Sequence, residues 1–231
     1  TGKLFEDIRD AVYAQADPNV VAAGGTRALE EAGIEVEAGL MLDAARHLNR
    51  AWTFAVEHAR PFVTWKFATS LDGRSAAADG TSRWISSRAA RLDTHRLRAE
   101  CDVMVVGTGT VEADDPELTV RDEFDVPVPH QPLRAVVGTR ALPAGRRVFN
   151  DLAPTHQFRS RDPQRVLAEL YAMGRRHAFL EGGPRLAAAF LSAGLIDEVV
   201  TYISPILLGA GRSAVADLGI TTIGEALHLD V

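Results

Sequence analysis

The stretch that decides the fold reads Val105-Val106-Gly107-Thr108-Gly109-Thr110-Val111-Glu112-Ala113-Asp114-Asp115-Pro116. It follows an apolar strand, residues 102–107, of the near-continuous kind found where helices cover both faces of a sheet. The glycines after the strand let backbone N–H groups approach a ligand, and the threonines offer hydroxyls. A dinucleotide-binding Gly-x-Gly-x-x-Gly pattern would need glycine where Glu112 stands, so this short loop is expected to bind a nucleotide in a manner other than the Rossmann one.

Two further runs of glycine, hydroxyl and charged residues lie next to apolar strand patterns. They are Lys66-Phe67-Ala68-Thr69-Ser70-Leu71-Asp72-Gly73 and Gly80-Thr81-Ser82-Arg83-Trp84-Ile85-Ser86. We expect the three runs to form loops that line a single pocket. A lysine inside an apolar strand is usually an edge residue whose amine reaches water. The alternative for Lys66 is that its ammonium points into the pocket.

From Pro61 onward, strand and helix patterns alternate. Strands are expected at 62–68, 102–107, 133–138, 178–181 and 198–204, and helices from Ser86 or Ser87 to about 100, from Asp162 to Gly174 and over 186–193. Such alternation is typical of an α/β sheet domain.

The preceding residues, from about 10 to 60, predict a short βαβα piece. Strands are expected at 11–14 and 34–37, with a helix over 24–32 between them that is closed by Gly33. One helix is expected over 42–57, and Arg60-Pro61 is the expected boundary because proline disfavours a continuing helix. Residues 10–60 contain few large apolar residues and would form only a thin core. We therefore expect them to belong to a larger domain or to cover the domain that follows.

Composition limits the classes of function. The chain has 25 Lys+Arg and 31 Asp+Glu, a net charge of −6, which argues against a general binder of nucleic acid or anionic membranes. The single cysteine, Cys101, cannot form an internal disulfide, so a reducing, cytoplasmic setting is expected. We see no apolar run long enough for a membrane span and no signal peptide. The histidines show no His-x-Glu spacing and the chain no Cys-x-x-Cys, so no metal site is expected.

Several charged residues are candidates for ligand binding. One face of the expected helix carries Arg88, Arg91, His95 and Arg98. For Arg88 and Arg91 a solvated face is an equal alternative, whereas Arg98 is favoured as an anion ligand. The pair Asp114-Asp115 is typical of a turn at a helix end, although a carboxylate at a pocket mouth can also orient a substrate or handle a proton.

The turn Gly182-Gly183-Pro184-Arg185 lies between a strand and a helix. It leaves backbone N–H groups free at a positive helix end, which is a ready site for phosphate. The alternative is a tight turn without a ligand.

Five motifs together resemble the reductase domain of the bacterial bifunctional riboflavin-biosynthesis deaminase-reductase family. They are residues 66–73, Gly80-Thr81-Ser82-x-Trp84-Ile85, Leu97-Arg98-Ala99-Glu100, residues 107–121 and Glu181-Gly182-Gly183-Pro184. The run over 108–121 is specific for the family, and the resemblance covers most of residues 62–211. Residues 17–50 resemble the last part of the family's zinc-dependent cytidine-deaminase-like domain, but the zinc motifs of that domain are absent here, so deamination by this sequence is not expected.

The resemblance implies an α/β fold in two parts. Residues 61–231 would form a dihydrofolate-reductase-like mixed sheet with flanking helices. Residues 1–60 would be the C-terminal part of the deaminase-like domain with a linker helix. By the same resemblance Thr1 lies inside that domain, and the family continues beyond the equivalent of Val231 with a further strand pair.

The resemblance also implies an activity: NADPH-dependent reduction of the ribosyl group of 5-amino-6-(5-phosphoribosylamino)uracil to ribityl, by a homodimer, with hydride added at the ribose C1′. It places the substrate on Ser82, Arg98, Leu118, Arg121 and Glu181, with the two arginines as partners of its 5′-phosphate. It places NADPH on Ala68, Trp84, Thr110, Asp114, Thr139, Gly183, Pro184, Arg185 and Leu186. We assign Asp114 the orienting or proton-handling role and Lys66 a weaker catalytic one near the ribose.

Two other functions stay open at this stage. The chain could be a stand-alone reductase of the 2,5-diamino pyrimidine ribotide, although the deaminase-like residues at 11–50 argue against it. It could also be a non-catalytic nucleotide-binding module, which would bind NADPH without oxidising it.

Overall fold

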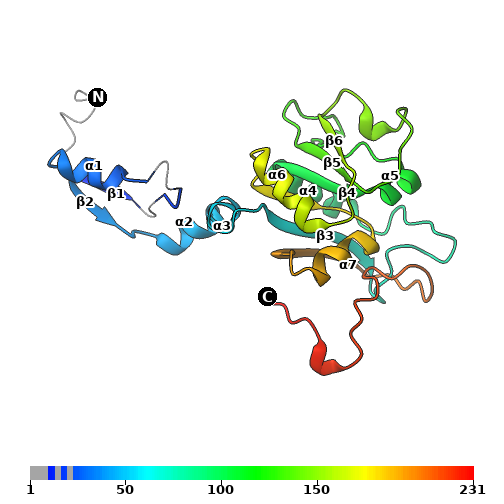
Figure 1. The fold of residues 1–231 in the computed structure, drawn as a ribbon. Helices are drawn as coiled ribbons and strands as arrows, with labels where there is room; N and C mark the ends of the chain where they lie inside the picture. Colours follow the sequence, from blue (N-terminus) through cyan, green and yellow to red (C-terminus); the bar gives the residue numbers. More distant parts are fainter. Residues whose placement is uncertain (1–9, 14–16, 20–22) are drawn as a thin grey trace.

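The computed structural model describes residues 10–13, 17–19 and 23–231. A small N-terminal unit is joined through two helices to a larger α/β body (Figure 1). Among the described residues, no helix is both long and apolar enough to cross a membrane.

The N-terminal unit contains two parallel strands, β1 (Asp10–Tyr13) and β2 (Glu35–Ala38), with α1 (Gly25–Glu31) between them. These elements confirm the sequence-based expectation. The single helix expected over 42–57 is wrong. The chain forms α2 (Leu42–Leu48) and α3 (Arg50–His58), separated at Asn49, whose φ of −100° and ψ of 14° interrupt the helical backbone. Because α2 has no buried residue, no packed apolar face favours one continuous helix.

Two ion pairs attach the end of this linker to the body. Arg60 donates two hydrogen bonds to Asp197, of 2.8 and 2.7 Å, and Arg50 of α3 donates one of 2.8 Å to Glu198. Asp197 also accepts the N–H of Val63, so one carboxylate holds both sides of the expected boundary.

A six-stranded sheet in the order β6-β5-β4-β7-β3-β8 forms the centre of the body. The strands are β3 (Phe62–Ser70), β4 (Val103–Gly107), β5 (Leu133–Val137), β6 (Thr155–Phe158), β7 (His177–Leu180) and β8 (Glu198–Ser204). All five pairings are parallel. The expectation of a mixed sheet is therefore wrong for these described strands. The carboxyl ends of all six strands therefore meet at one edge of the sheet.

Four helices flank the sheet: α4 (Arg88–Ala99), α5 (Thr108–Asp114), α6 (Pro163–Ala172) and α7 (Pro184–Ser192). The expected helix starts are confirmed. Ser87 caps α4 by accepting the N–H of Ala90 at 3.2 Å, and Asp162 caps α6 by accepting the N–H of Gln164 at 2.9 Å.

Two local expectations are wrong. The expected loop at 107–110 is in fact the first turn of α5, with Gly107 at its N-cap position. Strand β6 and the short 3₁₀ helices η2 (Arg147–Phe149) and η3 (Ile223–Glu225) were not expected. Strand β6 is mostly polar and buries only Phe158, and η2 and η3 are each three residues long, too short to give a periodic pattern.

The two faces of the sheet carry separate apolar clusters. On one face, Val105 and Leu180 pack with Leu167 of α6 and Phe190 of α7. On the other, Val106 packs with Val111 of α5, and Met104 packs near Leu97 of α4. The alternation of odd and even residues along β4 follows the two-residue period of a strand, and helices on both faces explain its unbroken apolar run.

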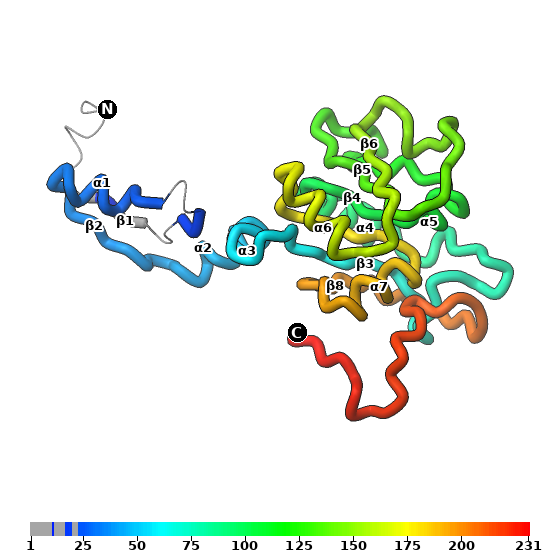
Figure 2. The backbone as a smooth tube through the Cα atoms, viewed as in Figure 1, coloured from blue at the N-terminus to red at the C-terminus, as the bar shows by residue number. Residues whose placement is uncertain are grey.

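After β8, residues 206–214 bond to residues 71–76 of the body, and the chain beyond them forms the red trace that loops away in Figure 2. It contains η3 and exposes Ile223, Leu227 and Leu229. In the part of the chain that the structure describes, β8 pairs only with β3, so the other side of β8 is an edge of the sheet.

Candidate active site

Three glycine-containing turns meet at the carboxyl edge of the sheet, after β4, β5 and β7. The N–H of Gly183 donates a 3.2 Å hydrogen bond to Oγ1 of Thr110, which joins the start of α7 to α5. A Cβ added to Gly182 would lie 2.7 Å from Leu186 Cδ2, and one added to Gly138 would lie 2.6 Å from Thr108 Oγ1. Only residues without a side chain fit these approaches.

Helices α5 and α7 begin at this edge, where backbone N–H groups can donate hydrogen bonds to a ligand. Neither α5 nor α7 has a side-chain cap, and Pro184 occupies the first turn of α7. The first N–H groups of a helix have no intrahelical acceptor, and the helix dipole places positive charge there. A packed glycine turn at an uncapped helix start is therefore suited to a phosphate group.

A buried ion pair lies beside these turns. Arg98 of α4 donates from Nε to Glu181 Oε1 at 2.6 Å and from Nη2 to Oε2 at 2.8 Å, and Glu181 directly follows β7. The side chains are 15% and 13% exposed. Burial alone would raise the pKa of Glu181, but Arg98, helped by Lys66, outweighs burial and lowers the pKa to about 2. Glu181 is therefore an anion at neutral pH.

Lys66 lies in the middle of β3, half-buried, in the field of the same ion pair. Burial lowers its pKa from the usual value, Glu181 opposes this shift, and the positive charge of Arg98 reinforces it. Its Nζ lies 5.4 Å from the centre of the Tyr202 ring. Strand β3 lies between β7 and β8, so Lys66 is not on an edge strand, and its half-buried side chain agrees with the inward alternative.

Arg121 is connected to the pair through one short segment. Nη1 of Arg98 donates to the carbonyl of Thr119 at 2.8 Å, and the N–H of Arg121 donates to His95 Nδ1 at 3.1 Å. The guanidinium of Arg121 contacts Glu117 and donates to the carbonyl of Asp125.

His95 accordingly bridges α4 and this segment. Burial and the charge of Arg98 lower the pKa of His95 to about 4, so the imidazole is neutral at pH 7 and can accept the Arg121 N–H.

The long loop between β3 and α4 carries Ser82 and Trp84. Trp84 is exposed, and the guanidinium carbon of Arg91 stacks 4.3 Å from its ring centre. Arg83 donates to the carbonyl of Asp114 at 3.0 Å, which brings this loop to the end of α5. Asp114 is the last residue of α5 and is exposed.

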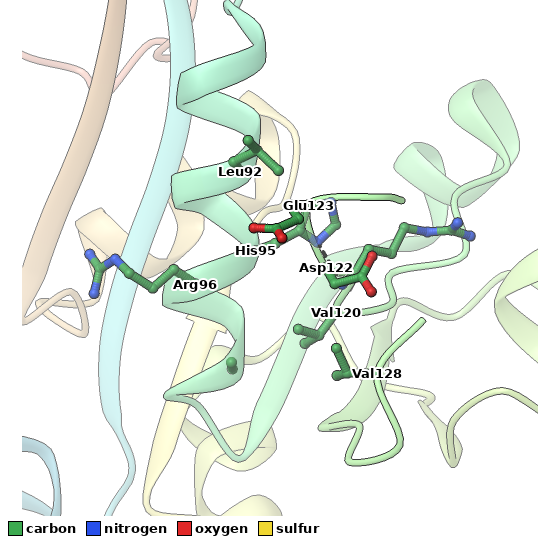
Figure 3. Close-up of a pocket in the computed structure, with 9 residues that line it drawn as sticks. Leu92, His95, Arg96, Val120, Asp122, Glu123 and Val128 are labelled. Atoms are coloured by element: carbon green, nitrogen blue, oxygen red, sulfur yellow. Dashed lines mark hydrogen bonds between the residues drawn. The ribbon is translucent and has the colours of Figure 1, made fainter. Parts of the chain in front are cut away.

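One hollow of about 340 Å³ lies between α4 and the segment 120–128. Figure 3 shows Leu92 and His95 of α4 facing Val120 and Val128 across it. Among the expected site residues, Arg121 lines this hollow, whereas the three glycine runs do not, so it is not the pocket that the sequence analysis expects.

The structure brings the expected residues together in two neighbouring groups. The cradle group is Thr110, Gly183, Pro184, Arg185 and Leu186, and the charged group is Lys66, Arg98, Glu181 and Arg121. Two expected residues lie outside these groups: Leu118 is buried in the apolar cluster of Val106 and Val111, and Thr139 is exposed two residues after the end of β5. Glu181 and Gly182 are consecutive, so the groups adjoin. For Ala68 and Ser82 the contacts are with the chain's own backbone: Ala68 pairs with Tyr202, and the carbonyl of Ser82 accepts from Ile85.

Sequence reasoning missed two contributors. His95 was placed on the same helix face as Arg98, three residues away, but its hydrogen bond to Arg121 could not be predicted. Arg140, next to Thr139, pairs with Glu112 at 2.7 Å and approaches Thr108 Oγ1 at 3.4 Å. The adjacency of Arg140 to Thr139 was the available signal for it.

The comparison with known proteins decides the family. Residues 61–230 match the family described as the RibD C-terminal domain. The chain belongs to this family. It is 52% identical over 218 residues to the riboflavin biosynthesis protein RibD of Mycobacterium tuberculosis, a match that covers 94% of this chain. The chain spans 64% of the length of that relative.

Two solved structures resemble the RibD-family chain over nearly all of its length. Acinetobacter baumannii RibD, form 2, is 32% identical with a TM-score of 0.86, covering 95% of this chain and 67% of that one. A diaminohydroxyphosphoribosylaminopyrimidine deaminase/5-amino-6-(5-phosphoribosylamino)uracil reductase from Thermotoga maritima is 26% identical with a TM-score of 0.82, covering 93% and 66%. The α/β fold with a central sheet and flanking helices is confirmed.

Proposed function

We propose that this chain reduces 5-amino-6-(5-phosphoribosylamino)uracil to its ribitylamino form with NADPH, as the reductase half of a bifunctional deaminase-reductase of riboflavin biosynthesis. The family and the reductase named in the Thermotoga maritima relative support this proposal. The observation that carries it is the glycine cradle beside the buried Arg98–Glu181 pair. One part suits a phosphate-bearing cofactor and the other a polar substrate.

The cradle fits the phosphates of a dinucleotide. Gly182 and Gly138 are packed so closely that a Cβ would clash, and neither α5 nor α7 is capped by the side chain of its N-cap residue. At α7 the N–H of Gly183 is already bonded to Thr110 Oγ1. When bound, NADPH supplies the hydride. In this proposal the cofactor is held by Ala68, Trp84, Thr110, Asp114, Thr139, Gly183, Pro184, Arg185 and Leu186.

The substrate occupies the charged group and the loop above it. Its contacts in this proposal are Ser82, Arg98, Leu118, Arg121 and Glu181. The Arg121 guanidinium already pairs with Glu117 and donates to the carbonyl of Asp125. A phosphate dianion must therefore displace one of these acceptors before Arg121 can bind it through two hydrogen bonds. Arg98 is held twice by Glu181, which favours binding of substrate hydroxyls by the carboxylate over binding of phosphate by the arginine.

Lys66 is, beside Asp114, a candidate proton donor in this proposal. Hydride addition at C1′ of a ring-opened imine leaves a nitrogen that must gain a proton. Burial lowers the pKa of Lys66 from its usual value, which eases release of that proton, and the charge of Glu181 opposes this shift. Asp114 lies at the end of α5 near the loop that carries Ser82, where it can orient the substrate or cofactor.

The remaining parts of the proposal concern the surroundings of this domain. Residues 1–60 are taken as the C-terminal part of a deaminase-like domain, in keeping with the family match that begins at residue 61. Zinc belongs to a deaminase portion that this sequence does not contain. The protein acts as a cytoplasmic homodimer on a small pyrimidine ribotide, without nucleic acid or membrane partners.

The test follows NADPH oxidation with freshly deaminated pyrimidine ribotide, comparing wild type with Asp114→Asn and with the matched control Asp43→Asn on exposed helix α2. The expected result is turnover in wild type and control, with a loss of turnover in Asp114→Asn that is far larger than its loss of NADPH affinity. Near-normal turnover of Asp114→Asn would remove the role of Asp114. Folded protein that binds NADPH without oxidising it is instead a binding module, and activity only with the 2,5-diamino ribotide indicates the stand-alone reductase.

A further inference from the structure

The order of the strands sets the direction of the cofactor, given the proposed function. Lys66 and Glu181 lie on β3 and after β7, on one side of the cradle formed after β4 and β7. A nicotinamide that reaches them must extend toward β3. The adenosine end must then extend the opposite way, toward β5 and β6. Thr139, two residues after the end of β5, agrees with this direction.

The ends of β5 and β6 are joined at that side. The N–H of Gly138 donates to the carbonyl of Phe158 at 3.0 Å, and Gln157 Nε2 donates to the carbonyl of Arg140 at 2.7 Å. Val137 pairs with Phe158 in the parallel register, so the backbone of Arg159, the next residue, lies beside Gly138 and one residue from Thr139. Arg159 begins the sequence Arg159-Ser160-Arg161 before the N-cap of α6.

Arg159 and Arg161 differ from their basic neighbour in being free. Both are exposed, and neither makes a hydrogen bond or ion pair with any residue in the described ranges. Arg140, by contrast, is paired with Glu112 at 2.7 Å. Two exposed arginines without an ionic partner among the described residues thus follow the end of β6, the side toward which the adenosine extends, in a chain whose net charge is −6.

We propose that Arg159, assisted by Arg161, binds the 2′-phosphate on the adenosine ribose and thereby selects NADPH over NADH. This inference rests on the proposed function, because the direction of the cofactor follows from the position of the hydride acceptor. A guanidinium binds a phosphate monoester through two parallel hydrogen bonds, and a free arginine needs no partner displaced first. NADH has a hydroxyl group in place of this phosphate, so it cannot form the ion pair with Arg159.

The test measures binding without turnover. Dissociation constants for NADPH, NADH, adenosine 2′,5′-bisphosphate and adenosine 5′-phosphate are determined by calorimetry for wild type, Arg159→Ala, Arg161→Ala and the double variant. Arg27→Ala is the matched control: it removes an exposed arginine of α1, in the distant N-terminal unit of Figure 1. Thermal unfolding confirms that each variant is folded.

We expect Arg159→Ala to weaken NADPH and the bisphosphate by about 10-fold or more, since a hydrogen-bonded charge contributes about 1.5–3 kcal/mol, and to leave NADH and adenosine 5′-phosphate within about 2-fold. Arg161→Ala should have a smaller effect in the same direction, and Arg27→Ala none. Equal weakening of NADPH and NADH, or no change in either, overturns the assignment while the reductase proposal stands. Wild-type protein that binds neither dinucleotide overturns both.

Discussion

The guanidinium of Arg98 and the carboxylate of Glu181 form a two-point ion pair, with N–O distances of 2.6 and 2.8 Å, that joins helix α4 to the end of β7. The third nitrogen of the guanidinium, Nη1, donates a 2.8 Å hydrogen bond to the carbonyl of Thr119. One side chain thus fixes three segments around the candidate substrate site. Because each partner compensates the buried charge of the other, both stability and the shape of the site depend on the pair.

Removing one partner of the buried Arg98–Glu181 pair should lower the free energy of unfolding more than removing one partner of an exposed ion pair. Glu181→Ala leaves Arg98 buried without its counter-charge, and we expect the free energy of unfolding to fall by about 3–5 kcal/mol. Urea denaturation at pH 7 measures the change. The control is Glu169→Ala, which breaks the exposed pair with Arg165 and should cost less than about 1 kcal/mol. Similar costs for the two variants would contradict a structural role for the buried pair.

The same pair predicts a specific acid sensitivity. The folded-state pKa of Glu181, about 2, lies below the usual value of 4.5, so the unfolded chain takes up this proton first as the pH falls. The stability that Glu181 contributes is present in full above about 4.5 and is lost as the pH falls toward 2. In Glu181→Gln, unfolding followed across this window should depend less steeply on pH than in wild type. Parallel pH profiles would show that Glu181 has an unshifted pKa.

Replacing Lys66 should raise the free energy of unfolding and abolish turnover. Its folded pKa lies below 10.5, so the protonated form costs stability at neutral pH, and this cost is relieved as the pH rises from the folded pKa toward 10.5. Lys66→Met removes the buried charge at similar length. We expect its free energy of unfolding at pH 7 to rise by about 1 kcal/mol while turnover is lost. A less stable variant that retains turnover would refute both parts.

His95 should position the Arg121 segment through one hydrogen bond. His95→Phe leaves the Arg121 N–H without its acceptor, which should cost about 1–3 kcal/mol and raise KM for the ribotide more than it lowers kcat. His95→Gln keeps an acceptor and should restore KM. Steady-state kinetics of both variants, with denaturation as the stability check, decide this. Equal KM values in the two variants would mean that the hydrogen bond has no positioning role.

The pH dependence of His95 gives a separate prediction. Its folded pKa of about 4 lies below the usual 6.5, so the unfolded state binds the proton first, and stability falls as the pH drops from 6.5 toward 4. His95→Gln should lose this part of the acid sensitivity, about 1–2 kcal/mol after screening by solvent. Denaturation at pH 7 and pH 4.5 measures the difference. An unchanged wild-type slope in the variant would contradict the shift.

Local rules predicted the ends of elements well because their causes are local. Ser87 and Asp162 cap α4 and α6 through their own backbone neighbours, and Gly33 and Gly194 adopt the positive φ that ends a helix. The first turn of α5 was missed because Gly107 and Gly109 favour a loop, and packing of Val111 against the sheet outweighs that preference.

Contacts distant in sequence set the rest of the site. The pairing of Arg98 with Glu181 joins residues 83 positions apart, so no spacing rule could assign it. For the same reason, the meeting of Thr110 with Gly183 was available only through family resemblance, which places both residues on one cofactor. Strand β6 escaped notice because an edge strand with one buried side chain has no clear two-residue pattern.

Arg134 should hold the segment that leads to the substrate residues. It lies in β5 with no exposed surface, and its guanidinium donates to the carbonyls of Glu117, Asn150 and Ala153. Arg134→Met fills similar volume but leaves these carbonyls without donors, so we expect a loss of about 3–5 kcal/mol in urea denaturation. Arg134→Lys should recover only part of it, because one ammonium cannot reproduce the planar fork. With Arg165→Ala as the exposed control, a loss below about 1 kcal/mol in Arg134→Met would show that water satisfies the carbonyls instead.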